Sequence, residues 1–442
     1  MKHPIVSKAR ARRDRHRGLT PEVRGKHHPT RGNFMSSGYF NRLGPGIVTG
    51  AADDDPSGIG TYSQAGAQAG YGFLWAAPWL LPFAFAVQEA CARLALVTGR
   101  GLASIIRTTL PRWVLVLAVL LVAVANTVNI AADLASMAAA LRLLVPIDQV
   151  LGVIGFATVV VLAEVMMPYH RYARILRWLT LSLLAYVAVL FVAKVNWSEV
   201  VVSTLIPQIG FDQSSIALMI ALAGTTISPY LFFWQAAEEV EERASKGLEG
   251  VGKSHIRAMR GDVFSGMLTG VFIMFAIMAT AGATLHQSGI TQIESAEDAA
   301  AALAPIAGQF AGLLFLLGIV GVGLLAIPVL AGSTAYAVAE TFGWRESLEL
   351  APRQAKAFYA VIIGSVLIAV LLNLVGIPPM TFLFLAAVLN GLAAPALMII
   401  VFVLARNKVL LGKFVSPRWS QWLLGIAIIV MVALPVAWLL TS

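Results

Sequence analysis

Residues 44–60 of the 442-residue chain read GPGIVTGAADDDPSGIG, which places three consecutive aspartates and a proline in an otherwise apolar stretch. An ionised aspartate at the centre of a membrane helix costs about 2.5–3.5 kcal/mol even on a lenient insertion scale. Proline removes a backbone donor and breaks the helical hydrogen-bond ladder. This segment therefore predicts an interrupted helix at membrane depth, with a function that offsets the cost of its charges.

The composition around this segment is that of a polytopic membrane protein. The chain is 58% hydrophobic and 12% charged, with a mean hydropathy of +0.79, whereas a soluble domain carries about 25% charged residues. A water-soluble fold is excluded. The single cysteine, Cys91, also excludes a disulfide framework, a multi-thiolate metal site and an iron–sulfur cluster.

Stretches of about 20 apolar residues predict eleven transmembrane helices. They lie near 43–63, 72–98, 113–143, 149–167, 176–195, 215–236, 263–284, 309–340, 358–376, 380–405 and 420–440. The sixth contains AGTTISPY at 223–230, so it is interrupted by proline like the first. Interrupted helices five spans apart favour an inverted-repeat transporter with its site near the midplane. The predicted repeats are 43–195 and 215–405, followed by an extra helix at 420–440.

The basic residues are segregated between alternate connections. Of 32 Lys and Arg, eleven lie in residues 1–42 and eighteen in every second connection from the one after the second span, while the other connections are acidic or neutral. The positive-inside rule then predicts a cytoplasmic amino terminus and an external carboxyl terminus in the cell membrane. We interpret 1–42 as a disordered cytoplasmic tail, so the expected partner is the lipid bilayer and not nucleic acid.

Oxygen donors gather in the sequence near the two breaks. They are the Asp55 carboxylate, the carbonyls freed near Ala52 and Thr225, and the hydroxyls of Ser228 and Thr226. No Met, Cys or His lies at either break, and a softer transition metal would be expected to find a sulfur or imidazole ligand. Hard oxygens with few direct ligands suit Mg²⁺, which keeps much of its water. The residues alone therefore favour a magnesium site with Asp55 as its charged ligand.

Other charges at membrane depth have two interpretations each. Asp53 and Asp54 either line the cation pathway or cap and solvate the broken helix end. Glu89 either lies on the pathway or pairs with Arg93, four residues later on the same helical face.

Four short motifs resemble those of one family, the Nramp divalent-metal transporters. Asp55-Pro56-Ser57-Gly58 resembles the Asp-Pro-Gly-Asn motif of their first span, and Ser228-Pro229-Tyr230 stands where their Met-Pro-His motif would be. Residues 92–100 and 132–135 are similar to the second-span and third-span motifs. The resemblance implies an all-α fold of about eleven transmembrane helices, a five-plus-five inverted repeat of the leucine-transporter type with broken helices 1 and 6, and transport without a cofactor.

The departures from the family pattern indicate the ion. In the family, the motif's Asp and Asn and the span-six Met bind the metal; here Asp55 is kept, while Gly58 and Ser228 stand at the other two positions. Tyr230 and Ser136 replace a histidine and a glutamate linked to proton movement. This pattern resembles the Nramp-related magnesium transporters, in which a wider site takes a partly hydrated Mg²⁺ and proton coupling is lost.

We therefore expect a secondary transporter and not an enzyme, moving Mg²⁺ with Mn²⁺ tolerated by alternating access without proton coupling. The expected metal site consists of Asp55, Gly58, Ala52, Thr225 and Ser228, and the expected cation pathway of Asp53, Asp54, Tyr230, Asp133 and Glu89. Three alternatives stay open. One is a proton-coupled Mn²⁺ or Fe²⁺ symporter, for which Asp133 is the remaining titratable candidate. The others are an organic-solute carrier of the same fold and a Mg²⁺-dependent membrane prenyltransferase, although the second acidic motif that a prenyltransferase needs is not visible in the spans.

Overall fold

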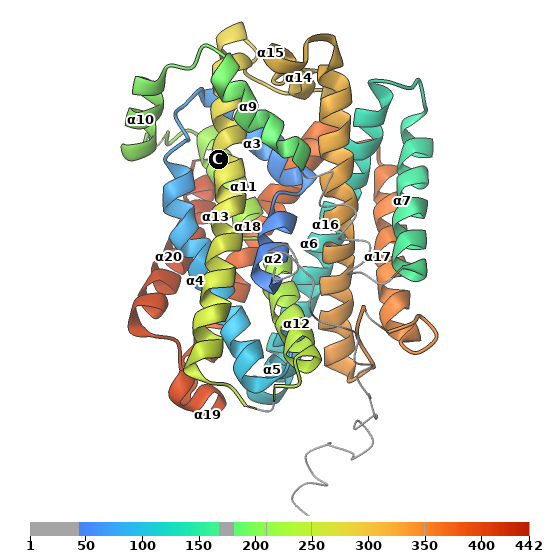
Figure 1. The fold of residues 1–442 in the computed structure, drawn as a ribbon, viewed down its shortest axis with the longest axis vertical. Helices are drawn as coiled ribbons and strands as arrows, with labels where there is room; N and C mark the ends of the chain where they lie inside the picture. The colour runs from blue at the N-terminus through green and yellow to red at the C-terminus, as the bar shows by residue number, and fades with distance from the viewer. Residues whose placement is uncertain (1–43, 168–180, 209, 249, 349, 442) are drawn as a thin grey trace, which may run out of the picture. The chain divides into compact units, whose positions relative to one another are not determined.

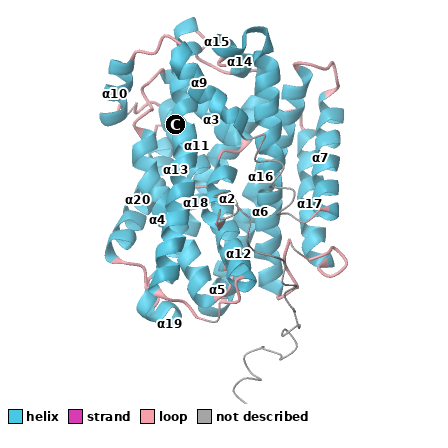
Figure 2. Cartoon of the chain, viewed as in Figure 1, coloured by secondary structure: helices cyan, strands magenta, loops and turns pink. Residues whose placement is uncertain are grey.

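The structure is a computed structural model that describes residues 44–167, 181–208, 210–248, 250–348 and 350–441. All the regular structure in these residues is helical, as Figure 2 shows. The tail predicted at 1–42 lies outside the described residues, as does the basic connection with Arg171, Arg174 and Arg177.

The first half of the described chain forms the two short helices of the first break and the five helices that follow them. These are α2 (Pro45–Asp53), α3 (Pro56–Ala69), α4 (Ala76–Thr98), α5 (Leu102–Thr109), α6 (Arg112–Arg142), α7 (Gln149–Met166) and α9 (Leu184–Val192), the last preceded by a 3₁₀ turn at Leu181–Leu183.

The second half repeats this design with a second broken helix. Its helices are α10 (Trp197–Leu205), α11 (Gln213–Thr226), α12 (Pro229–Ser245), α13 (Lys253–Thr284), α14 (Ala296–Ala301), α15 (Ala304–Ala307), α16 (Ala311–Phe342), α17 (Lys356–Asn373), α18 (Pro379–Ala405), α19 (Lys408–Leu411) and α20 (Arg418–Leu440). Further 3₁₀ turns lie at His286–Ser288, Gly308–Phe310 and Gly412–Phe414.

Each of the eleven predicted spans coincides with helix within the described residues, which confirms the all-α polytopic class. By length and composition, nine helices of the described chain can cross a membrane, or ten if the bent pair Leu181–Val192 and Trp197–Leu205 is one span. The first predicted span, which forms α2 with 9 residues and α3 with 14, is not among them. The second broken span is counted whole, as Gln213–Ser245.

The broken helices lie at the centre of the bundle. In Figure 1, α2 and α3 lie in line behind α13 and beside α16, and α13 contacts both of them. Of the apolar window in α11–α12, 94% of the residues are buried, against 17% in α20. Because a helix buried on all sides cannot face lipid, the two breaks are shielded from the bilayer while α20 forms part of the lipid-facing surface.

Small residues let α2 approach α13 closely. A Cβ atom on Gly50 would lie 2.1 Å from the Gly266 carbonyl oxygen, and one on Gly46 would lie 2.5 Å from the Val263 Cα. No larger residue fits at either position without moving the helices apart. The two amides at the start of α2, of Gly44 and Gly46, donate to the Asp262 carboxylate of α13 at 3.1 and 2.6 Å.

The connections separate by charge between the two ends of the bundle. Figure 1 shows α5 and α19 at one end, and α10, α14 and α15 at the other. Basic residues flank α5 and α19, whereas acidic residues such as Glu199, Glu294 and Glu297 lie in or before α10 and α14. The alternation expected from the sequence is therefore present in the arrangement of the helices.

Candidate functional site

The first break is built by an aspartate that starts a helix. α2 ends at Asp53, and Asp55 is the N-cap of α3 with Pro56 in the first helical position. One oxygen of Asp55, Oδ1, accepts hydrogen bonds from the Gly58 amide at 2.7 Å and from the Ser57 hydroxyl at 2.8 Å. Aspartate at the N-cap and proline after it are strongly preferred helix starts, so the local sequence fixes where the carboxylate lies.

A second element holds the other oxygen of Asp55. The Asn129 side chain of α6 donates to Asp55 Oδ2 at 2.6 Å, and both residues are buried. Asn129 was not among the residues expected at the site. A signal was available, because Asn126, Asn129 and Asp133 are spaced i, i+3 and i+7 in an otherwise apolar helix and so share one face.

The second break lies against the first. Ser228, the N-cap of α12, donates through its hydroxyl to the carbonyl oxygens of Gly224 at 3.0 Å and Thr225 at 2.7 Å. The Thr225 and Ser57 hydroxyl oxygens lie 3.5 Å apart. A Cβ atom on Gly58 would lie 3.3 Å from Thr225 Oγ1. The segments at 52–58 and 225–230 therefore meet across the centre of the bundle.

The residues predicted to bind metal are brought together at these two breaks. Ala52, Asp55, Thr225 and Ser228 are each 1% exposed, and Gly58 is buried with them. Within the described residues, no three His, Cys, Asp or Glu side chains converge on one point. The predicted metal site thus contains one carboxylate, Asp55, with neutral carbonyl and hydroxyl oxygens, and Asp53 and Asp54 are also buried at the first break.

One expectation about the donors was wrong. The sequence places no sulfur at either break, but the Thr226 hydroxyl donates to the Met274 sulfur of α13 at 3.5 Å. Residues 48 positions apart cannot be seen as neighbours along the chain; the packing of α13 beside the broken helices brings them together. A thioether therefore lies one hydrogen bond away from the second break.

Four of the five residues predicted to line a cation pathway also lie near the breaks. The Tyr230 hydroxyl donates to the Ala52 carbonyl at 2.8 Å. Asp53 and Asp54 are buried, and in each Oδ1 has no hydrogen-bond partner among the described residues. Asp133 is fully buried, and its carboxyl group lies near the Asp55 carboxylate and the backbone amide of Ser57.

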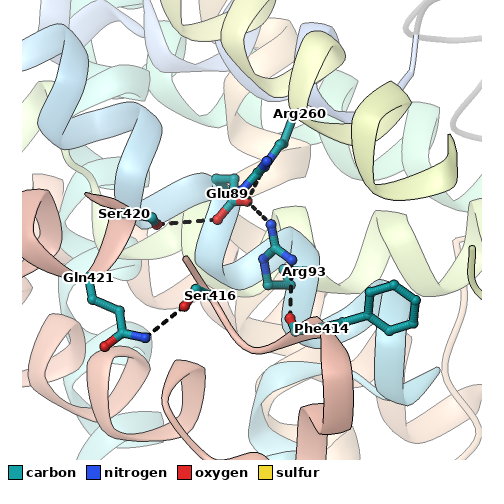
Figure 3. A network of polar contacts seen from close by, with 7 residues as sticks. All are labelled: Glu89, Arg93, Arg260, Phe414, Ser416, Ser420 and Gln421. Carbon is teal, nitrogen blue, oxygen red and sulfur yellow. Dashed lines mark hydrogen bonds and ion pairs between the residues drawn. The ribbon is translucent and has the colours of Figure 1, made fainter. Parts of the chain in front are cut away.

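Glu89 lies apart from these residues, in the buried polar network of Figure 3. Its carboxylate accepts from Arg93 and from Arg260 Nε at 2.8 Å, and the Ser420 hydroxyl lies 3.4 Å away. Arg93 also donates to the Phe414 carbonyl at 3.1 Å. The network joins α4, α13 and α20 through a carboxylate that two guanidinium groups neutralise, as a structural ion pair at membrane depth requires.

A cavity lies beside α3, the helix that begins at the first break. It has a volume of about 530 Å³ and is lined by residues of α3, α11 and α18 together with the segment before α14. Gln64 and Gln68 give its α3 wall polar side chains, and Gly60 of α3, five residues after Asp55, lies at its edge. The Leu383 side chain packs against Gly60, 2.9 Å from where a Cβ atom would lie.

The comparison with known families decides the identity of this fold. A family model described as natural resistance-associated macrophage protein-like, or Nramp, matches residues 46–441. The chain belongs to the Nramp family. Because members of this family are metal transporters, the chain is a transporter and not an enzyme, which removes the prenyltransferase alternative.

Several curated proteins and solved structures are similar to this Nramp chain. Two proteins named divalent metal cation transporter MntH, from Yersinia pestis and Klebsiella pneumoniae, are each 27% identical over 416 residues, covering 90% of this chain and 94% of theirs. A crystal structure of the Eremococcus coleocola manganese transporter has a TM-score of 0.71 at 17% identity, covering 90% of this chain and 87% of that one.

Mhp1, a nucleobase-cation-symport-1 family transporter in a closed conformation, has a TM-score of 0.56 at 14% identity, covering 90% of this chain and 91% of that one. These neighbours confirm the fold of the leucine-transporter type. The MntH relatives are named for divalent metal cations, and the Eremococcus coleocola protein is named for manganese.

Proposed function

We propose that this protein carries divalent cations across the cell membrane by alternating access around the two helix breaks, with Mg²⁺ as its main substrate and Mn²⁺ tolerated. The observation that supports this proposal is that the two breaks meet and bury the predicted donors, which are the Asp55 carboxylate and the neutral oxygens of Ala52, Thr225 and Ser228. A small cation that keeps part of its hydration shell needs few direct ligands of this kind.

The membrane potential is a sufficient driving force for such uptake. Two charges moving down 100 mV gain about 4.6 kcal/mol, so a divalent cation can enter without a coupling ion. The charge separation between the ends of the bundle supports a cytoplasmic amino terminus and an external carboxyl terminus. In that orientation the 530 Å³ cavity, which Gly60, Gln64 and Gln68 of α3 line, would be on the outer side of the breaks.

A second candidate function is proton-coupled uptake of Mn²⁺. The names of the relatives favour it, and so does the Met274 sulfur beside Thr226, because a thioether prefers Mn²⁺ to Mg²⁺. In this case the buried Asp133 carboxyl, which lies near Asp55, is the group that would exchange the proton.

Uptake into proteoliposomes tests both candidates. The purified protein is reconstituted, a fixed inside-negative potential is imposed, and initial uptake of Mg²⁺, Mn²⁺ and Ca²⁺ is measured beside Asp55→Asn and empty vesicles. We expect saturable Mg²⁺ uptake that Asp55→Asn abolishes. Uptake restricted to Mn²⁺ and accompanied by protons would establish the second candidate, and no uptake of any divalent cation would refute transport through this site.

A further inference from the structure

A chain of hydrogen bonds runs from the cation site into two other helices. Asn129 of α6 donates from Nδ2 to Asp55 Oδ2 at 2.6 Å, and Asn390 of α18 donates from Nδ2 to Asn129 Oδ1 at 3.4 Å. All three side chains are 0–1% exposed. The chain therefore joins the N-cap of α3 to α6 and α18 in the interior of the bundle.

The carboxylate fixes the direction of this chain. An ionised aspartate only accepts hydrogen bonds, so the amide nitrogen of Asn129 must face Asp55. The Asn129 oxygen is then left to accept from Asn390. This order turns the Asn390 oxygen, Oδ1, away from Asn129, and it has no hydrogen-bond partner among the described residues.

We expect the Asn390 Oδ1 atom to accept a hydrogen bond in some state of the protein. Buried polar groups are nearly always hydrogen-bonded, to protein or to ordered water. A partly hydrated cation at Asp55 brings water molecules whose hydrogens point away from the ion. Such a water can complete the chain at Asn390, whereas a bare cation would offer that oxygen only direct coordination.

We propose that Asn129 and Asn390 extend the cation site onto α6 and α18. Asn129 is a positioning residue that orients the Asp55 carboxylate, and the Asn390 oxygen accepts a hydrogen bond from a water molecule of the bound cation. The proposal rests on the divalent-cation transport proposed above. In the family motif, an asparagine stands at the position of Gly58 in α3. Here the side-chain amide beside the Asp55 carboxylate comes instead from Asn129 of α6.

α6 offers a matched control one turn away. Asn126 is also 0% exposed, its Nδ2 donates to the Leu330 carbonyl and to the Ser333 and Thr334 hydroxyls at 2.8–3.0 Å, and its Oδ1 likewise lacks a partner among the described residues. These contacts are to α16 and not to Asp55. Substitution of Asn126 therefore shows how removal of a buried asparagine outside the site affects folding and KM.

The experiment compares Asn129→Leu, Asn390→Leu and Asn126→Leu in proteoliposomes, using Mg²⁺ alone as the probe. Folding is checked by gel filtration and thermal unfolding. We expect KM for Mg²⁺ to rise about tenfold or more in Asn129→Leu and Asn390→Leu and to change less than about twofold in Asn126→Leu, since each lost contact to the site is worth about one decade of affinity. Serine at the same positions replaces any leucine variant that does not fold.

The variant Asn390→Asp separates the donor role of Asn390, toward Asn129, from its acceptor role toward water. Asn390→Asp keeps an acceptor oxygen but loses the donor to Asn129, so its KM should stay nearer to wild type than that of Asn390→Leu. Equal KM values in Asn129→Leu and Asn126→Leu would overturn the proposal while leaving transport intact. Failure of the wild-type protein to take up any divalent cation would instead overturn the proposed function.

Discussion

The Tyr230 hydroxyl donates a hydrogen bond to the Ala52 carbonyl oxygen across the two breaks, at 2.8 Å. Ala52 lies in the last turn of α2, where carbonyl groups have no partner within the helix. The same carbonyl is a predicted metal ligand. Tyr230 therefore occupies one of the two lone pairs of this carbonyl oxygen. A cation that approached the oxygen from the side of Tyr230 would have to displace this hydrogen bond.

Replacement of Tyr230 by phenylalanine should tighten cation binding. A hydrogen bond of this kind contributes about 0.5–1.5 kcal/mol, so KM for Mg²⁺ should fall by a factor of about 2 to 10 in Tyr230→Phe. Initial uptake rates at varied Mg²⁺ measure the change. Tyr359→Phe, which loses a tyrosine contact to the Leu350 carbonyl at 3.0 Å away from the breaks, is the control. A higher KM in Tyr230→Phe would mean that Tyr230 supports the bound state.

Asp55 should be essential for transport but not for folding. Asn is as good an N-cap as Asp, so Asp55→Asn keeps the start of α3 while removing the charge that binds the cation. We expect uptake to be lost and the elution profile of the purified protein to stay unchanged. Asp53→Asn and Asp54→Asn should retain more activity, because neither carboxylate belongs to the predicted metal site. Equal loss in all three folded variants would rule out a single-carboxylate site.

Apolar segments long enough to span a bilayer predicted the long helices of the described bundle but not the short ones between them, such as α5, α10 and α19. A helix in lipid must satisfy all of its backbone hydrogen bonds within itself. The proline in each broken span likewise marked the breaks. Local rules thus determine where the chain crosses the membrane and where α3 and α12 begin. Pro56 and Pro229 both occupy the first turn of the helix that follows the break.

The contacts between helices were not predictable in the same way. Asn129 reaches Asp55 over 74 positions, and Met274 reaches Thr226 over 48. These pairs depend on the rotation and depth of α6 and α13, which hydrophobic periodicity alone does not determine in helices that are apolar on most faces. Glu89 shows the reverse case, since its i, i+4 pairing with Arg93 is local and was one of the two expected interpretations.

Selectivity should respond to the residue at the start of α12. Ser228→Met introduces a thioether where the hydroxyl now donates to two backbone carbonyls, so uptake of Mn²⁺ and Cd²⁺ should rise relative to Mg²⁺. Competition among the three ions in one uptake assay measures this ratio. An unchanged ratio in a transporting variant would place the site elsewhere.

The asparagine that the family motif has at the position of Gly58 is harder to restore. In Ser228→Met combined with Gly58→Asn, the new Cβ atom at position 58 would lie 3.2 Å from Tyr62 Cε2 and 3.3 Å from Thr225 Oγ1. The double variant should therefore show a further shift toward Mn²⁺ together with a lower melting temperature than Ser228→Met alone.

Glu346, in the connection after α16, should make stability depend on pH. Burial, with the charges of Glu340 and Glu241, raises the pKa of this carboxyl group, and its Oε2 lacks a hydrogen-bond partner among the described residues. Because the folded-state pKa lies above the usual value of about 4.3, the folded protein holds this proton more tightly than the unfolded chain. Its contribution to stability is complete below that value and declines as the pH rises toward the folded-state pKa.

Replacing Glu346 with glutamine, which does not ionise, should remove this loss of stability at high pH. The melting temperature of Glu346→Gln should exceed that of the wild-type protein at pH 8, and the difference should shrink toward pH 4. The exposed Glu297, in the first turn of α14, supplies the control substitution Glu297→Gln. A difference that does not vary with pH would contradict this origin.

Whether protons enter together with the metal distinguishes the two candidate functions most directly. A coupled symporter needs a side chain near the metal that changes protonation during the cycle, and histidine is the natural group at neutral pH. The second break instead has Tyr230, whose hydroxyl is engaged with the Ala52 carbonyl, and Gln235, which accepts from the Thr49 hydroxyl at 2.6 Å. Asp133 is the remaining candidate, and Ser136 beside it donates back to its own helix at 2.8 Å.

We therefore predict that Mg²⁺ entry into proteoliposomes acidifies the lumen no more than the leak in empty vesicles, while uptake still increases with an inside-negative potential because the cation carries the charge. A pH-sensitive dye in the lumen reports the proton and a Mg²⁺ indicator reports the metal in the same vesicles. Asp133→Asn should then transport Mg²⁺ without any change in the proton signal. A metal-dependent proton influx that disappears in Asp133→Asn would instead identify Asp133 as the coupling residue and establish proton symport, since only loss of its ionisable carboxyl group separates this variant from the wild-type protein.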